Sequence, residues 1–118
     1  MVFGAGGDRD HAKRPRMGAV AAELADHVVV TSDNPRSEPP AAIISDVMAG
    51  VAAGAQAHVV VEPDRVAAIT RAIEAARPGD VVVVAGKGHE TTQTIGDRVI
   101  ELDDRAVVRA LLATRSSS

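Results

Sequence analysis

The chain is predicted to be an α/β domain with a mostly parallel sheet and a C-terminal antiparallel hairpin. Short runs of valine alternate along the sequence with longer stretches in which apolar residues recur at helical spacing. The valine runs are apolar at consecutive positions, as expected of strands that are buried on both faces. The length of 118 residues is that of one ordinary domain.

Two strand–helix units are predicted in the first half of the chain. Residues 1–4 are expected to form a short strand, which leads into a glycine-rich loop. A helix is expected over 15–25, because proline is favoured in the first helical turn. Residues 28–31 are predicted to be an apolar strand and 32–38 a loop. A second helix is expected from Pro39 or Pro40 to about Val51.

The second half begins with a predicted strand over 58–61 and a helix that starts at Pro63. Pro78-Gly79-Asp80 is a signal for a chain turn. The strand predicted at 81–85 is the most apolar in the chain, and we expect it to be central in the sheet. The first strand is short for a sheet interior, which suggests that the chain begins partway along a strand of a larger protein.

The C-terminal part is predicted to be a hairpin followed by a helix. Residues 91–95 and 98–102 flank Gly96-Asp97, which reads as a hairpin turn. Asp103 or Asp104 can cap a last helix, which we expect to end near Ala113.

Composition excludes several classes of function. The formal net charge is −3 and Phe3 is the only aromatic residue, so neither the basic surface nor the stacking platforms of nucleic-acid-binding proteins are expected. No apolar run approaches the length of a membrane span, and there is no cysteine for a disulfide or a thiolate metal site. We expect a monomeric cytoplasmic protein without a metal site, with a domain over 1–114 and a disordered tail over 115–118.

Three polar loops follow predicted strands, at the edge of a parallel sheet where ligands usually bind. The first reads Gly4-Ala5-Gly6-Gly7-Asp8-Arg9-Asp10, with Lys13 beyond it. Its glycines let backbone N–H groups approach an anion. Asp8 and Lys13 are candidates to face phosphate or ATP. Arg9 stands where the dinucleotide-binding fingerprint has its third glycine, and no Walker sequence follows. The alternative is a tight turn with solvated charges.

The second loop is Asp33-Asn34-Pro35-Arg36. It offers a carboxylate, an amide and a guanidinium within four residues, a mixture that suits a zwitterionic ligand. Pro35 restricts Asn34 to extended geometry and stiffens the loop. The alternative is an Asx-type turn with Arg36 pointing into solvent.

The third loop is Gly86-Lys87-Gly88-His89-Glu90, directly after the most apolar predicted strand. Its two glycines free the backbone to approach a ligand. The three polar side chains could meet a phosphate, a proton or an ammonium group, and Lys87 and His89 are further candidates to face ATP. The alternative for His89 is an ordinary hydrogen-bonding role, because no orienting partner is visible in the sequence.

In this order and spacing, the three loops resemble the C-terminal domain of the Mur ligases that add meso-diaminopimelate. The motifs are GAGGDRDxxKRPxMG, TxDNPRxEPPxxIIxDVMAG and VVVAGKGHE, and the resemblance extends over residues 2–112. It implies a Rossmann-like three-layer domain within a three-domain enzyme of peptidoglycan precursor synthesis. Such enzymes use ATP and magnesium to join meso-diaminopimelate to UDP-MurNAc-L-Ala-D-Glu.

The resemblance also implies roles for individual residues. Arg9 would bind a carboxylate of the amino acid, Arg36 the carboxylate of its distal centre, and Asn34 the neighbouring ammonium group. Gly86 and Glu90 would contact the same ammonium group. Lysine lacks the distal carboxylate, so leaving the arginine unmatched would disfavour it by about 2–5 kcal/mol. The implied substrate-binding set is Arg9, Asp33, Asn34, Pro35, Arg36, Gly86 and Glu90, and no residue of the chain is expected to be catalytic.

The chain departs from the family in ways that bear on activity. It has no Gly-x-x-Gly-Lys-Thr/Ser sequence, and the family's sites for ATP, magnesium and UDP lie in two other domains. Thr91-Thr92-Gln93 stands where an acidic–aromatic pair usually precedes the glutamine. We therefore expect the isolated chain to be inactive as a ligase. The alternatives are a non-catalytic diaminopimelate-binding module, a Mur ligase domain for another amino acid, and a generic Rossmann-like nucleotide-binding domain.

Overall fold

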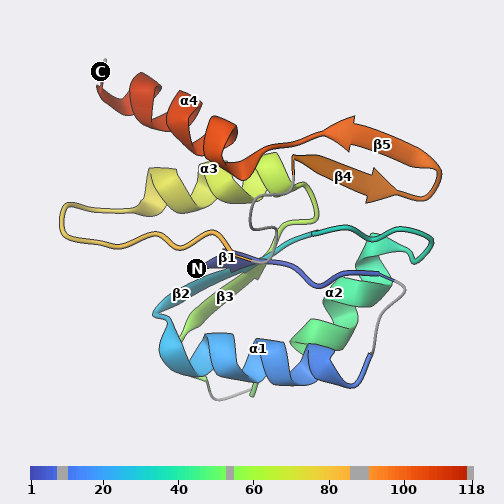
Figure 1. The fold of residues 1–118 in the computed structure, drawn as a ribbon. Coiled ribbons are helices and arrows are strands. Elements are labelled where there is room, and N and C mark those ends of the chain that lie inside the picture. The colour runs from blue at the N-terminus through green and yellow to red at the C-terminus, as the bar shows by residue number, and fades with distance from the viewer. Residues whose placement is uncertain (8–10, 53–54, 86–90, 117–118) are drawn as a thin grey trace.

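Three layers make up the fold of the computed structural model (Figure 1). A parallel sheet lies between two pairs of helices, and a two-stranded hairpin forms a second, separate sheet. The structure describes residues 1–7, 11–52, 55–85 and 91–116. The predicted class, an α/β domain with a parallel sheet and a C-terminal antiparallel hairpin, is confirmed.

The parallel sheet has the order β1-β2-β3. Strand β1 is Val2–Phe3, β2 is His27–Val30 and β3 is His58–Val61. In their register Val2 lies opposite Val29, and His27 lies opposite His58. Because all three strands run the same way, their carboxyl ends lie along one edge, and the loops that leave this edge start close together.

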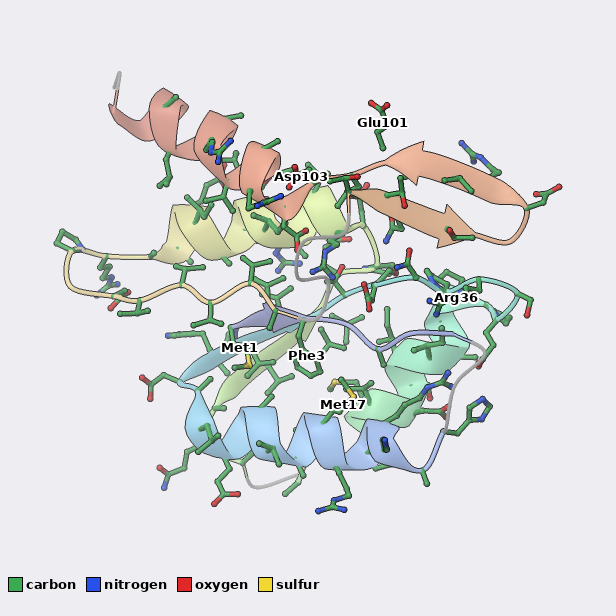
Figure 2. The ribbon with its side chains drawn as sticks, in the orientation of Figure 1. Met1, Phe3, Met17, Arg36, Glu101 and Asp103 are labelled. Atoms are coloured by element: carbon green, nitrogen blue, oxygen red, sulfur yellow. The ribbon has the colours of Figure 1, made fainter. Side chains whose placement is uncertain are left out.

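Helices α1 (Lys13–Leu24) and α2 (Pro40–Met48) cover one face of the sheet. Figure 2 shows Phe3 on this side of β1, facing α1 and α2. The two helices approach closely because residue 18 is glycine: a Cβ there would lie 2.1 Å from the carbonyl oxygen of Val47. The buried cluster on this face consists of Phe3, Ala5, Ala21, Val28, Val30, Ile43, Ile44 and Val47.

Helices α3 (Arg65–Ala75) and α4 (Asp104–Ser116) cover the opposite face. Helix α3 has a side-chain N-cap, since the Asp64 carboxylate accepts a hydrogen bond of 3.1 Å from the Ala67 N–H. Strand residues alternate between the two faces, so Val29 points to this side while its neighbours point to the other. The buried cluster here consists of Val2, Val29, Ala68, Ile69 and Ile73.

The predicted central strand at 81–85 is wrong. Only Val84 forms an isolated parallel bridge, to Val2, and the segment lies beyond β1 at the edge of the sheet. Val2 donates to the Val83 carbonyl oxygen at 2.8 Å and accepts from the Ala85 N–H at 2.9 Å. Strand β1 is two residues long, so it offers the segment too few backbone groups for a ladder. Val81 is consequently 85% exposed.

The hairpin was predicted correctly, whereas several helix boundaries move. Strands β4 (Thr92–Ile95) and β5 (Arg98–Glu101) are antiparallel, and Gly96 turns between them with φ of 61°. Helix α1 begins two residues before the predicted start at Pro15, and α2 ends three residues before Val51. Helix α4 passes Ala113 and takes in residues 115 and 116, which the sequence had suggested as part of a tail. No helix in the described ranges is long and apolar enough to cross a membrane.

Candidate functional site

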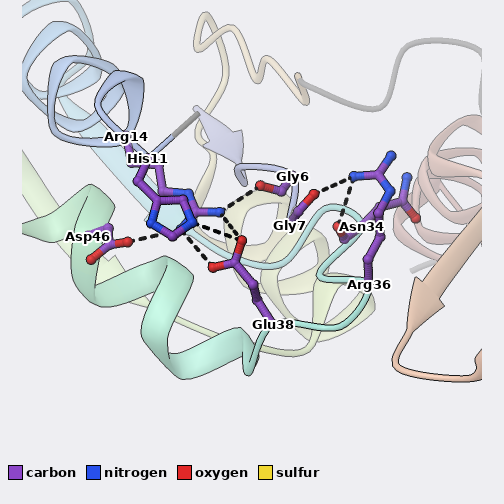
Figure 3. Close-up of polar contacts among 8 residues, drawn as sticks. All are labelled: Gly6, Gly7, His11, Arg14, Asn34, Arg36, Glu38 and Asp46. Atoms are coloured by element: carbon purple, nitrogen blue, oxygen red, sulfur yellow. Dashed lines mark hydrogen bonds and ion pairs between the residues drawn. The ribbon is translucent and has the colours of Figure 1, made fainter. Parts of the chain in front are cut away.

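Two of the three candidate loops meet at the carboxyl edge of the sheet. The Gly7 N–H donates to the Asn34 carbonyl oxygen at 2.7 Å. In return, Nη1 of Arg36 donates to the Gly7 carbonyl oxygen at 2.9 Å (Figure 3). These bonds join the loop after β1 to the loop after β2. Six of the predicted site residues fall outside the described residues, namely Asp8, Arg9, Gly86, Lys87, His89 and Glu90.

The glycines of the first loop allow its backbone to pack directly on the second loop. A Cβ at Gly4 would lie 2.5 Å from the Thr31 carbonyl oxygen, and one at Gly7 would lie 1.7 Å from that of Pro35. A side chain at either position would therefore push the two loops apart. Since the Gly7 N–H already donates to Asn34, this part of the loop is not arranged as an open cradle for phosphate.

Strand β4 supports the second loop from the other side. The Arg36 N–H donates to the Thr94 carbonyl oxygen at 2.9 Å, and the Arg36 carbonyl accepts from the Gly96 N–H. The buried Gln93 side chain donates to the Asp33 carbonyl oxygen at 2.7 Å. The second loop is thus held between the glycine loop and the hairpin, which limits the positions that its side chains can take.

Asn34 makes a structural contact at the place where a ligand contact was expected. Its side chain is 6% exposed, and its Oδ1 accepts from the Thr94 N–H at 2.8 Å. An amide oxygen that is buried and bonded in this way shapes the loop. The role of Asn34 toward an ammonium group stays a prediction.

Arg36 carries a charge that no carboxylate in the described part of the chain neutralises. Its backbone is left-handed, with φ of 55°, a region that residues other than glycine rarely adopt. Nη1 of the half-buried side chain donates to the carbonyl oxygens of Gly7 at 2.9 Å and Asn34 at 3.3 Å. The same described residues offer no acceptor to Nε or Nη2. This edge of the guanidinium can receive a carboxylate through two parallel bonds.

The contacts of Arg36 argue against the alternative in which its side chain simply points into solvent. An arginine that simply points into solvent would touch nothing on the first loop, whereas this guanidinium donates to the Gly7 carbonyl oxygen (Figure 3). The backbone carbonyls therefore fix the direction of the side chain, and because they are uncharged they do not neutralise the guanidinium.

Arg14 is a buried arginine that the loop motifs did not reveal as functional. It is 1% exposed, and it donates to the Glu38 carboxylate at 2.8 and 2.9 Å and to Asp46 at 2.9 Å (Figure 3). Hydrogen bonding with Glu38 raises the pKa of Arg14, burial opposes this rise, and Asp46 adds to it. A further bond of 3.0 Å reaches the Gly6 carbonyl oxygen, so Arg14 braces the first loop. The signal in the sequence was its helical spacing from Gly18 on the buried face of α1.

Arg65 is the second buried arginine that sequence motifs missed. Its Nε and Nη2 donate to the two carboxylate oxygens of Asp104 at 2.8 and 2.7 Å. Nη1 donates to the Ser32 carbonyl oxygen at 2.9 Å, and Nη2 to that of Ala85 at 3.1 Å. One side chain of α3 thereby contacts the end of β2, the end of the 81–85 segment and the start of α4.

Lys13 is the first residue of α1, and its side chain is exposed. Its contact with ATP or phosphate stays a prediction. No group of three or more histidine, aspartate or glutamate side chains within the described ranges is placed to hold a metal ion.

The fold and the motifs at its carboxyl edge define a ligase domain. The chain belongs to the Mur ligase family, since the family model described as "Mur ligase, glutamate ligase domain" matches residues 1–88. The resemblance predicted from the three loops is therefore confirmed at the level of the family.

The particular relatives carry one name, UDP-N-acetylmuramoyl-L-alanyl-D-glutamate--2,6-diaminopimelate ligase. The protein from Solibacter usitatus is 60% identical over 111 residues, which cover 94% of this chain and 22% of the relative. The protein from Synechococcus elongatus is 56% identical over 117 residues, which cover 99% of this chain and 23% of the relative. This chain thus spans less than a quarter of the length of either relative.

A solved structure with the same name has the same fold. The two structures superpose with a TM-score of 0.85 at 39% sequence identity. The match covers 98% of this chain and 24% of the solved chain. The fold described above is therefore that of one part of a longer ligase.

Proposed function

We infer that this chain is the amino-acid-binding domain of an ATP-dependent ligase that adds meso-diaminopimelate to UDP-MurNAc-L-Ala-D-Glu during peptidoglycan precursor synthesis. The names of the relatives support this reaction. The single structural observation that carries the proposal is the guanidinium of Arg36, which is held in place by two backbone carbonyls and has no carboxylate partner in the described part of the chain.

The chemistry of the substrate explains why an arginine in this state is useful. Diaminopimelate differs from lysine by one carboxylate on the distal carbon. A half-buried guanidinium without a partner gains a charge-assisted pair when this carboxylate arrives, and gains nothing from lysine. The backbone carbonyls of Gly7 and Asn34 occupy only Nη1, so Nε and Nη2 can bind the carboxylate.

The other ligand contacts belong to the same proposal. Arg9 is proposed to bind a carboxylate of the amino acid. The second loop, Asp33-Asn34-Pro35-Arg36, is proposed to recognise the distal centre, and we call it the recognition loop. The Gly86 carbonyl and the Glu90 carboxylate take the distal ammonium group. Lys13 is proposed to face the nucleotide, together with Asp8, Lys87 and His89.

We assign binding and orientation of the amino acid to this chain, and not phosphoryl chemistry. Its sequence has no Gly-x-x-Gly-Lys-Thr/Ser loop, so residues outside the 118 would have to hold ATP and magnesium. ATP and magnesium activate the D-glutamate carboxyl group of the acceptor when they are bound. On this proposal the chain alone is inactive as a ligase and acts as a cytoplasmic monomer without nucleic-acid or membrane partners.

Calorimetry with meso-diaminopimelate and L-lysine tests the proposal. We expect the chain to prefer diaminopimelate by at least about 30-fold, the lower end of the 2–5 kcal/mol cost of an unmatched buried charge. Arg36→Asn should abolish this preference and leave the fold intact, because asparagine tolerates the left-handed backbone. Arg16→Asn on the exposed side of α1 is the matched control and should bind as the parent chain does. Equal binding of both amino acids by the parent chain would contradict the proposal.

A generic nucleotide-binding domain is the second candidate. It has less support, because the Gly7 N–H that would meet a phosphate already donates to Asn34. ATP binding that is unchanged in Arg36→Asn, combined with no response to diaminopimelate, would favour this candidate.

A further inference from the structure

Arg65 lies at the junction of three parts of the chain that are distant in sequence. It is 1% exposed, at the start of α3, and its Nε and Nη2 donate to the Asp104 carboxylate at 2.8 and 2.7 Å. Asp104 is the first residue of α4 and is itself buried. This pair fixes the plane of the guanidinium, because a fork of two parallel bonds allows little rotation.

The remaining donors of Arg65 point at two backbone carbonyls. Nη1 donates to the Ser32 oxygen at 2.9 Å, and Nη2 to the Ala85 oxygen at 3.1 Å. Ser32 immediately precedes Asp33, the first residue of the recognition loop. Ala85 ends the segment that runs beside β1. The guanidinium therefore holds the base of the recognition loop at a set distance from this neighbouring segment.

The sheet itself gives the 81–85 segment little support. Its only ladder contact among the described residues is the bridge between Val84 and Val2. Val81 is 85% exposed, and Val82 and Val83 are 37% and 44% exposed. Two hydrogen bonds among the described residues place the end of this segment: Arg65 donates to the Ala85 carbonyl oxygen, and the Ala85 N–H donates to Val2. The recognition loop, by contrast, is also held by the glycine loop and the hairpin.

We propose that Arg65 is a positioning residue for amino-acid recognition. Asp104 fixes the Arg65 guanidinium, which in turn holds the carbonyl groups of Ser32 and Ala85 in place. Arg65 touches no ligand. Loss of its geometry would displace the base of the recognition loop and with it the direction of Arg36. The identity of the ligand rests on the proposed function above, whereas the effect on the loop does not.

Lysine cannot replace arginine in this position. The guanidinium spreads its donors over three nitrogens in one plane and so reaches two carboxylate oxygens and two carbonyls at once. A lysine ammonium has one nitrogen at the end of a flexible stem. Arg65→Lys therefore keeps a positive charge opposite Asp104 but loses the bonds to the two carbonyl groups. An effect of this variant would come from lost positioning of these carbonyls and not from an unpaired Asp104.

Amide hydrogen exchange and calorimetry on the complete chain test this proposal. In Arg65→Lys we expect faster exchange of the Arg36 N–H, which donates to Thr94, and of the Ala85 N–H, which donates to Val2. The Glu62 N–H, which donates to Val30 between the ends of β3 and β2, should exchange at its original rate. Affinity for meso-diaminopimelate should fall by between about 2-fold and 30-fold, the range typical of residues that act without touching the ligand.

Two further variants serve as a matched control and as a substitute for Arg65→Lys. Arg71 lies on the same helix with its side chain 51% exposed. The variant Arg71→Lys keeps the charge opposite Glu62 and should change neither exchange nor affinity. If Arg65→Lys proves too unstable to study, Asp104→Asn replaces it in the experiment. Asparagine keeps the shape of the aspartate side chain, and this variant should likewise accelerate exchange at Arg36 and Ala85. Unchanged exchange at both amides, or equal acceleration at Glu62, would overturn the proposal. If the parent chain does not bind diaminopimelate, the proposed function fails, yet the exchange rates still decide the role of Arg65.

Discussion

Single arginine side chains at the carboxyl edge of the sheet differ in how their charge is compensated. Arg14 and Arg65 are almost wholly buried, and each donates to at least one carboxylate. Arg36 is half-buried and meets only carbonyl oxygens in the part of the chain that the structure describes. Burial of an unpaired charge is costly, which is why the two buried arginines are paired with carboxylates. On the proposed function, the half-buried Arg36 is the arginine that binds an anion.

Replacement of Arg14 tests whether the buried, paired arginines stabilise the fold. Arg14→Ala removes the partner of Glu38 and Asp46, whose side chains are 18% and 44% exposed. Because water can reach both carboxylates, we expect a loss of about 2 kcal/mol in the free energy of unfolding, below the range for a fully buried pair. Urea denaturation measures this loss. Arg16→Ala, on the exposed side of the same helix, should cost much less, and an equal loss in both variants would refute the assignment.

The sequence predicted those helices and strands that depend on residues close together in the chain. The β3 strand and the β4–β5 hairpin lie where the valine run and the Gly96-Asp97 turn predicted them. The segment 81–85 has an even stronger apolar run and is nevertheless not a strand. A strand needs a partner with free backbone groups, and β1 provides only two residues. Local apolarity could not reveal the length of that partner.

Close packing of α1 on α2 depends on one glycine within a helix. Alanine normally stabilises a helix interior by up to about 1 kcal/mol relative to glycine. At residue 18 the added Cβ would meet the Val47 carbonyl oxygen at 2.1 Å, so the helices would have to separate. We expect Gly18→Ala to lower the free energy of unfolding by about 1–3 kcal/mol, as measured by urea denaturation. A gain in stability would show that the two helices can move apart without cost.

At the scale of the whole molecule, the fold brings loops that are distant in sequence together at the carboxyl edge of the parallel sheet. The order of the loops and their residue types were visible in the sequence, and they sufficed to predict the family. The contacts that hold these loops were not visible, because their partners are far apart along the chain. Arg65 and Asp104 are 39 residues apart, and Gln93 and Asp33 are 60 apart. Such pairs follow from the three-dimensional path, which no local pattern encodes.

The proposed binding of the distal carboxylate by Arg36 can be followed on the guanidinium itself. We would follow the Arg36 Nε–H signal by nitrogen-15 NMR while titrating the chain with meso-diaminopimelate and, separately, with L-lysine. A carboxylate that binds to Nε and Nη2 should shift this signal in a saturable way with diaminopimelate and leave it unchanged with lysine. A signal that stays in place with diaminopimelate, while other resonances of the chain show that the ligand binds, would contradict the account.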